Sequence, residues 1–437
     1  MSVTKTGIIA QSGADRDAAW GLANRGGGAN AAAMSRGPDQ SVTTEGLPPA
    51  FRLACACSLW PPSPARDAAV RQAAAEVDWA RFMRVLARQR LHGLAHAALV
   101  AAAVTPPPAI EAQLARAAQL TAFRALALAA EAVRLQALFE AEQVPALCIK
   151  GAALAQLAYG GQALKHCRDI DLLVSPADAE RSFAILQREG YAPIIPKGPL
   201  SEAQRRIVFR AHKDMELFQP ERRLSLELHW RLVDNPVLLE AIGVGSPTQS
   251  VAVLGGQLAT LADPQLFAYL ATHGATHCWF RLKWLADLNA WLSGKSADEV
   301  VGFYDCAEAL GVAACAGQAL LLCQRLLGYP IPPALAARLD GRGLRGMVAA
   351  ALDAMIGPNG ETELLQRPFG PFRLLAPQFA RGRGARFFWA QCRLLVENLE
   401  DKLDYPLPTP LHFLYPLLRL PFWLLRLQRR RRGTATA

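Results

Sequence analysis

The spacing of hydrophobic positions changes near residue 144, and this change divides the chain into regions. Between residues 49 and 143 the apolar positions recur every three or four residues, as in "DWARFMRVLARQRLHGLAHAALV". That spacing places them on one side of a helix, so we expect a helical N-terminal region. Residues 1–48 lack such a period and are rich in glycine, alanine and serine, a composition that predicts disorder.

Residues 144–236 break into short apolar runs separated by turns. The runs "VPALC", "RDIDLLV" and "YAPII" are bounded by glycine, proline or polar residues, which predicts strands. The segments "HKDMELF" and "LSLELHWRL" alternate apolar and polar positions and are joined by "QPERR", which predicts a β-hairpin. Helical spacing occurs in "AALAQLAYG" and "SPADAERSFAILQREG". Together these segments predict a small mixed-sheet core.

Helical spacing returns in residues 237–405, as in "PQLFAYLATHGATHCWFRLKWLADLNAWLS". The predicted fold class is therefore α+β, with a small mixed sheet flanked by N- and C-terminal helical regions. Residues 406–437 form a tail that is apolar at first, is interrupted by Pro416 and Pro421, and ends in the arginine cluster Arg429–Arg432. The chain has no uncharged run of about 20 apolar residues, so no transmembrane helix is expected.

The composition of the chain indicates a class of binding partner and a cellular compartment. The 437 residues include 47 lysines and arginines against 37 aspartates and glutamates, a formal net charge of +10. Such a chain favours an anionic partner, such as a nucleotide or an acidic membrane surface. The tail fits either peripheral contact with an anionic membrane surface or an amphipathic segment folded back on the body, and the sequence leaves both alternatives open. The sequence has no helix-turn-helix motif and no aromatic platform, so sequence-specific nucleic-acid binding is not expected. The nine cysteines lack zinc-site spacing, which is typical of a reduced, cytoplasmic protein.

Two carboxylates lie close together inside the apolar run "RDIDLLV". Side chains of a strand alternate, so Asp169 and Asp171 share one face while Ile170 and Leu172 share the other. Two carboxylates about 7 Å apart repel each other unless a cation lies between them. Hard divalent ions such as Mg²⁺ bind carboxylate and phosphate oxygens. We therefore predict a metal site here, and the alternative is a pair of solvated residues at a strand end.

A third carboxylate would complete a site for two metal ions. In "LSLELHWRL" the alternation predicts one polar face, formed by Ser225, Glu227, His229 and Arg231. We predict Glu227 as the third ligand. Asp214 and Glu216 on the neighbouring strand remain competitors, and the polar face of an edge strand is the structural alternative.

Lys150 and Gly151 lie where the first predicted strand turns into a helix. Backbone N–H groups at a helix N-terminus point outward and favour phosphate. Gly151 would let a triphosphate approach the backbone closely, and Lys150 would neutralise its charge. Arg168, next to Asp169, is a candidate for the same role from the other side. His229 is a further candidate for nucleotide contact, although a strand histidine beside a tryptophan is commonly structural.

A pair of histidines marks the later helical region. In "THGATHCWFRLKWLADL", His273 and His277 are four residues apart on a predicted helix. We expect them to cover the active-site cleft, with Arg281 and Lys283 facing the nucleotide or the acceptor.

The order of these motifs resembles the DNA polymerase β-like nucleotidyltransferase superfamily. More narrowly, "LCIKGAALAQLAYGGQALKHCRDIDLLV", "LELHWRL" and "HGATHCWFRLKWLADL" are similar to a bacterial family of uncharacterised nucleotidyltransferases. The resemblance covers roughly Phe51 to the start of the C-terminal tail. In the superfamily the phosphate turn is Gly-Ser or Gly-Gly, whereas this chain has Gly151-Ala152; the narrower family carries the Lys-Gly form.

The resemblance implies transfer of a nucleoside monophosphate from an NTP to an acceptor that is a small molecule, a protein or an RNA. Asp169, Asp171 and Glu227 would hold Mg²⁺ or Mn²⁺, and residues 144–236 would form the nucleotidyltransferase core. Two alternatives remain. One is a catalytically weak nucleotide-binding or assembly protein in a polysaccharide or peptide-modification pathway, and the other is a nucleotidyltransferase of the toxin–antitoxin type.

Overall fold

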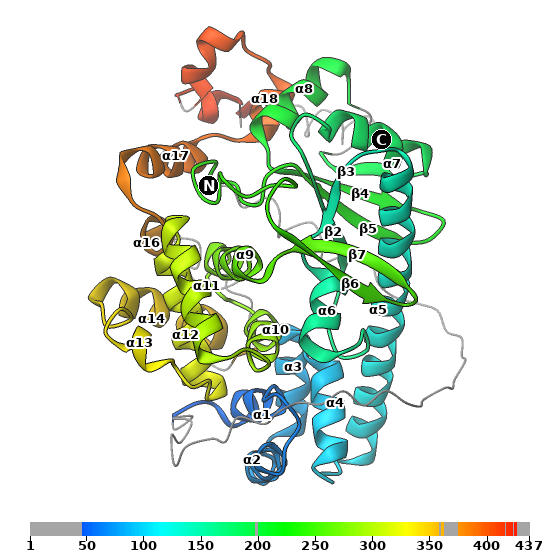
Figure 1. Ribbon diagram of the computed structural model, residues 1–437, viewed down its shortest axis with the longest axis vertical. Coiled ribbons are helices and arrows are strands. Elements are labelled where there is room, and N and C mark those ends of the chain that lie inside the picture. The colour runs from blue at the N-terminus through cyan, green and yellow to red at the C-terminus, as the bar shows by residue number, and fades with distance from the viewer. Residues whose placement is uncertain are drawn as a thin grey trace.

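A computed structural model describes most of the chain. The described residues are 46–196, 200–357, 360–361, 375–415, 417–422 and 424–425. Most of the segment expected to be disordered, residues 1–45, and the arginine cluster Arg429–Arg432 lie outside them. The predicted α+β class is confirmed, because helices that precede and follow it in the sequence flank one small mixed sheet (Figure 1).

The sheet has five strands in the order β1-β2-β5-β4-β3. Their bounds are β1 Ala146–Cys148, β2 Asp169–Val174, β3 Ala192–Ile195, β4 Asp214–Gln219 and β5 Leu224–His229. Strands β2 and β5 pair in parallel, and the other three pairings are antiparallel. Each strand coincides with a predicted one, and the two central strands carry the predicted metal ligands.

One face of the sheet is apolar and covered. Ile170, Leu172, Leu226 and Leu228 pack in a single buried cluster with residues of the 34-residue helix α5 (Pro108–Ala141) and of α7 (Ala179–Arg188). In Figure 1 α5 is the long helix that runs from the bottom of the view up beside the sheet. The alternate residues of the same strands therefore point to the opposite face, away from this cluster.

The N- and C-terminal helices are packed on each other around one apolar core. The N-terminal set is α1 Pro49–Cys57, α2 Pro64–Ala74, α3 Trp79–Gln89 and α4 His92–Ala101. The C-terminal set includes α9 Asp263–Thr276, α10 Leu282–Leu292, α11 Ala297–Ala309, α12 Ala313–Leu327, α13 Pro333–Ala336 and α14 Arg342–Ile356. Gln89 ties the two sets together, since its Oε1 accepts from the Leu282 N–H at 2.7 Å and its Nε2 donates to the Met355 carbonyl at 3.0 Å.

A second sheet interrupts the region in which only helices were expected. β6 (Thr248–Val253) and β7 (Gly256–Leu261) form an antiparallel hairpin whose turn has positive φ at Leu254 (49°) and Gly255 (80°). Gly256 is required by close packing on α5, because a Cβ atom there would lie 2.3 Å from Val133 Cγ1. The strands are short and half-exposed, so their alternation was a weak signal beside the long helical runs around them.

Shorter helices complete the described chain. They are α6 Gly151–Tyr159, α8 Glu202–Ala211, α16 Leu375–Ala380, α17 Gly384–Val396, α18 Leu399–Asp404 and the 3₁₀ helix Thr409–Leu414. After α18 the chain exposes several large apolar side chains, among them Phe413, Leu417 and Leu420. No helix within the described ranges combines the length and apolar character needed to cross a bilayer. Membrane contact through the tail stays a prediction.

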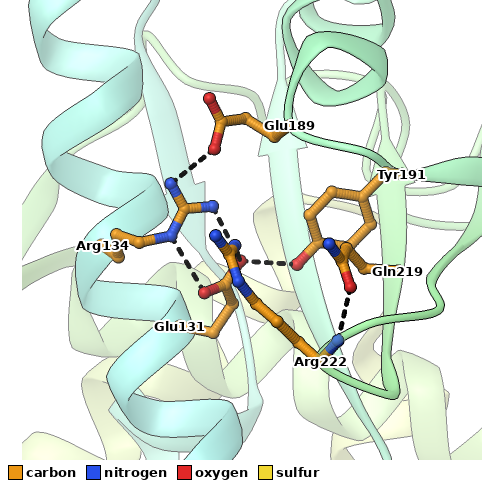
Figure 2. Close-up of polar contacts among 6 residues, drawn as sticks. All are labelled: Glu131, Arg134, Glu189, Tyr191, Gln219 and Arg222. Atoms are coloured by element: carbon orange, nitrogen blue, oxygen red, sulfur yellow. Dashed lines mark hydrogen bonds and ion pairs between the residues drawn. The ribbon is translucent and has the colours of Figure 1, made fainter.

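A buried polar network fixes α5 to the edge of the sheet, as Figure 2 shows. Glu131 of α5 is 6% exposed, and its carboxylate accepts from Arg134, from the Tyr191 hydroxyl at 2.9 Å and from Arg222 Nη1 at 2.8 Å. Arg134 also donates to Glu189 at 2.7 Å. Burial opposes the charge on Glu131, yet these donors hold its pKa below the ordinary value. The network joins α5 to the start of β3 and to the β4–β5 turn.

Replacement of Glu131 by glutamine is expected to lower the free energy of unfolding by about 2 kcal/mol, because charge-assisted hydrogen bonds are lost from a buried position. Since the folded pKa lies below the ordinary value of about 4.3, this stability is present above that pH and is lost as pH falls through the folded pKa. Urea unfolding at neutral and acidic pH measures both effects. An equal difference between wild type and variant at pH 7 and pH 3 would contradict the assignment.

Candidate functional site

The polar face of the sheet collects acidic and imidazole side chains from three strands. In the parallel pairing Asp171 lies beside Glu227, and Leu173 lies beside His229. In the antiparallel pairing on the other side of β5, Glu216 lies beside Glu227 and Asp214 beside His229. Directly paired residues point to the same face. The register therefore assembles side chains that are far apart in sequence.

Asp171, Glu227 and His229 form the tightest group. Each offers a ligand atom, and these atoms all lie within 4.8 Å of one another. His229 Nε2 is 3.4 Å from Asp171 Oδ1 and 3.2 Å from Glu227 Oε2. Burial opposes a charge on His229, but the two facing carboxylates raise its pKa above the ordinary value. Elsewhere in the described residues no comparable group of three metal-binding side chains occurs.

Asp169 lies beside this group but is not part of it. Asp169 pairs with Ser225 and lies two residues before Asp171 on β2. Burial, and then repulsion from Asp171 and Glu227, raise the pKa of Asp169 to about 6. Of the three predicted ligands, the structure thus brings Asp171 and Glu227 together and leaves Asp169 at the rim. His229, predicted only as a nucleotide contact, takes the third place in the group.

Lys150 supplies the counter-charge. Its Nζ lies 2.8 Å from Asp171 Oδ1. Burial disfavours the ammonium ion, but Asp171 raises the pKa of Lys150 well above its ordinary value. In turn, burial would raise the pKa of Asp171, and the contact with Lys150 instead holds it below the ordinary range. The two groups are a buried ion pair at neutral pH.

The Lys150–Gly151 turn brings the start of α6 to the acidic face. Gly151 has φ +57°, a conformation that favours glycine over residues with a side chain. Just before the turn, the Ile149 N–H donates to the Asp171 carbonyl at 3.2 Å. The first residues of α6 are therefore held next to β2, and phosphate binding at this turn stays a prediction.

Arg168 and Lys283 lie on the Asp169 side of the site. The Arg168 carbonyl accepts from Arg124 at 3.0 Å. Lys283 donates to the His166 carbonyl at 3.1 Å, and burial together with nearby cations lowers its pKa to about 7. The charge of Lys283 lowers the pKa of Asp169 and so favours its carboxylate form. The charge of Arg168 lowers the pKa of Arg124.

Arg281, in contrast, does not face the site as expected. Its guanidinium donates to the Arg88 carbonyl and lies over the Phe280 ring at 5.1 Å, in the joint between α3 and α10. Arg281 is the N-cap residue of α10, and Lys283, two residues later, donates instead to the His166 carbonyl.

Helix α9 covers the acidic face with a stripe of rings. Tyr269, His273 and His277 are spaced by four residues, and successive ring centroids are 5.9 and 4.8 Å apart. Tyr269 is fully buried, and burial raises the pKa of its hydroxyl, on which the charges of Lys150 and Asp171 also act. Burial, followed by the charge of Lys150, lowers the pKa of His277 to about 3 and that of His273 well below its ordinary value. Both histidines are therefore neutral at pH 7.

Sequence reasoning missed two residues near the site. Lys213, directly before β4, forms an ion pair with Asp214, whose Oδ2 is 3.9 Å from His229 Nδ1. Tyr269 was also missed. The i, i+4 spacing to His273 was a signal for Tyr269, and the neighbouring charges in "HKDMELF" were a signal for Lys213.

Comparison with known protein families decides the class of the chain. A family described as "Uncharacterised nucleotidyltransferase" matches residues 75–328, more than half of the chain. The chain belongs to this family. The match spans the whole five-stranded sheet and helix α9, so every residue of the acidic group lies within it. No curated protein and no solved structure matches the chain.

The residues of the acidic group fit a divalent cation. Both ring nitrogens of His229 are buried with carboxylate oxygens 3.2 to 3.9 Å away, and Asp171 Oδ1 is buried beside Lys150 Nζ at 2.8 Å. Carboxylate oxygens suit Mg²⁺ and Mn²⁺, and an imidazole nitrogen in the same group favours Mn²⁺ over Mg²⁺. A cation between these groups would also offset the repulsion between Asp171 and Glu227.

Substitution of Asp171 by asparagine or of Glu227 by glutamine is expected to weaken Mn²⁺ binding at least about tenfold, since changes even outside the ligand shell have effects of that size. Titration calorimetry measures the affinity. Glu221→Gln, an exposed position in the β4–β5 turn, is the matched control and should bind as wild type does. Unchanged affinity in both site variants would place the metal elsewhere.

Proposed function

We propose that the protein is a metal-dependent nucleotidyltransferase that moves a nucleoside monophosphate from an NTP to an acceptor. The observation that carries the proposal is the parallel register of β2 and β5, which sets Asp171 beside Glu227 with His229 in reach of both. Membership of a nucleotidyltransferase family supports the same class of reaction.

Asp171, Glu227 and His229 would hold the cation, Mg²⁺ or Mn²⁺. When bound, such a cation supplies positive charge for the triphosphate and for the departing pyrophosphate. Asp169, at the rim of the group, adds negative charge that strengthens cation binding. Burial, and then repulsion from Asp171 and Glu227, raises the pKa of Asp169, so a bound cation would favour its charged form.

The remaining cations of the site would bind phosphate. Lys150 would exchange its contact with Asp171 for the triphosphate, while the Gly151 turn admits phosphate oxygens to the backbone N–H groups of α6. Arg168 and Lys283 would approach from the Asp169 side. In the reaction an acceptor oxygen forms a bond to the α-phosphorus, the bond from that phosphorus to the bridging oxygen breaks, pyrophosphate leaves, and the acceptor's proton passes to solvent.

A second candidate function is nucleotide binding without turnover. Two observations favour it: Ala152 follows Gly151 where the superfamily carries serine or glycine, and Lys150 pairs with Asp171, one of the residues that would hold the cation. A pocket with its own counter-ion binds a cation less readily than an unpaired acidic pocket does.

Release of pyrophosphate from each of the four NTPs, with Mg²⁺ or Mn²⁺ and transfer of labelled NMP, tests the choice between the two. We expect turnover in wild type and a loss of about a hundredfold or more in Asp171→Asn, because transition-state charge is then poorly stabilised. Glu221→Gln should retain wild-type turnover. Nucleotide binding with no turnover in wild type would instead establish the second candidate.

Substitution of Lys150 by methionine separates its two contacts. We expect Mn²⁺ to bind more tightly, because a competing cation has been removed from Asp171. At the same time the KM for NTP should rise about tenfold, the size of one lost charge-assisted hydrogen bond. Calorimetry and steady-state kinetics measure the two quantities, and a parallel loss of both affinities would show that Lys150 only maintains the local structure.

A further inference from the structure

A cavity of about 640 Å³ lies beside the sheet, between α8, the segment that follows β5, and helices α17 and α18. Its volume is within the range of small-molecule sites. Four arginines line it, Arg206, Arg210, Arg231 and Arg393, together with Lys402, Trp389 and two carboxylates. The cavity is therefore cationic, with one large aromatic side chain in its wall.

The carboxylates do not neutralise all of this charge. Glu397 pairs with both Arg393 and Lys402, and Arg206 pairs with Glu202 on its own helix. Arg210 and Arg231 form no ion pair with any described residue. Arg231 is half-buried, and its Nε is buried without a hydrogen bond in the described structure. Asp234, the second lining carboxylate, acts on the charge of Arg231 without forming an ion pair with it, so both guanidinium groups can still bind an anionic ligand.

The cavity is joined to the acidic group through β4 and β5. Arg231 follows His229 by two positions and donates through Nη2 to the His212 carbonyl. His212 directly precedes the Lys213–Asp214 pair, and Asp214 lies beside His229. Asp234, another lining residue, acts on the pKa values of Lys213 and His277, so it also lies close to the covered face of the sheet.

We propose that this cavity binds the acceptor, and that the acceptor is a small organic molecule bearing a phosphate group. Guanidinium groups bind phosphate in a bidentate manner, so Arg210 and Arg231 would hold the phosphate. Trp389, 68% exposed, would contact the organic part. The role of this molecule as acceptor rests on the proposed nucleotidyl transfer. Its binding in the cavity does not depend on turnover.

Phenyl phosphate is a suitable probe, because it combines a phosphate with a ring, and benzyl alcohol is its uncharged counterpart. Titration calorimetry with the full-length chain should show binding of phenyl phosphate and none of benzyl alcohol. Arg210→Gln should weaken the affinity for phenyl phosphate about tenfold or more, because one charge-assisted contact is lost. Trp389→Ala provides a second variant at an exposed position that leaves the core intact.

Arg205→Gln is the matched control, since Arg205 is on the same helix but does not line the cavity. Its affinity for phenyl phosphate should match that of wild type, and the affinity of all three variants for NTP should be unchanged. Wild-type affinity in both Arg210→Gln and Trp389→Ala, or an equal loss in Arg205→Gln, would overturn the assignment of the cavity. So would a parallel loss of NTP affinity, which would make the cavity part of the donor site.

Proximity to the metal group can be measured independently of turnover. With Mn²⁺ bound, the ³¹P relaxation of phenyl phosphate should be enhanced in wild type and much less in Asp171→Asn or Arg210→Gln. Probe binding without this enhancement, in a protein shown to bind Mn²⁺, would remove the acceptor role. If no NTP is turned over but the probe still requires Arg210, the proposed function fails while the phosphate site stands.

Discussion

The arrangement of the site depends on one electrostatic constraint: two carboxylates from adjacent parallel strands are held side by side in a covered part of the sheet. Asp171 is 3% exposed and lies in register with Glu227. Removing a charged carboxylate from water costs on the order of several kcal/mol unless an opposite charge offsets this loss of hydration. Lys150 provides that charge in this structure, and the proposed cation would provide it during the reaction.

The surrounding fold maintains this juxtaposition. On the back of the sheet, apolar residues of β2 and β5 pack against α5, and the Glu131 network fixes α5 at the sheet edge. On the front, Tyr269 and the neutral histidines of α9 limit access of water to the carboxylates. A low local dielectric strengthens every charge interaction of the site, which is useful for binding a triphosphate and costly when the pocket lacks a counter-ion.

Local patterns predicted much of this structure. Short apolar runs bounded by turn residues identified β1, β2 and β3, and alternation identified β4 and β5. The period of a strand placed Asp169 and Asp171 on one face, and the Lys150–Gly151 step marked the turn into α6. The register between β2 and β5 was not readable, because pairing of distant strands follows from tertiary packing rather than from local spacing. That register decides which acidic residue joins Asp171, and it admits His229 while leaving Asp169 at the rim. The contribution of α9 was likewise only partly visible, since Tyr269 resembles any core residue in sequence.

The most direct test of the central claim is a crystal structure of the protein with Mn²⁺ and a non-hydrolysable NTP analogue, with the metal located by anomalous scattering. The account predicts an anomalous peak bounded by Asp171, Glu227 and His229, with Lys150 moved from Asp171 to the phosphates. A peak at another place, or nucleotide bound while the Lys150–Asp171 pair stays intact and no metal occupies the group, would contradict it.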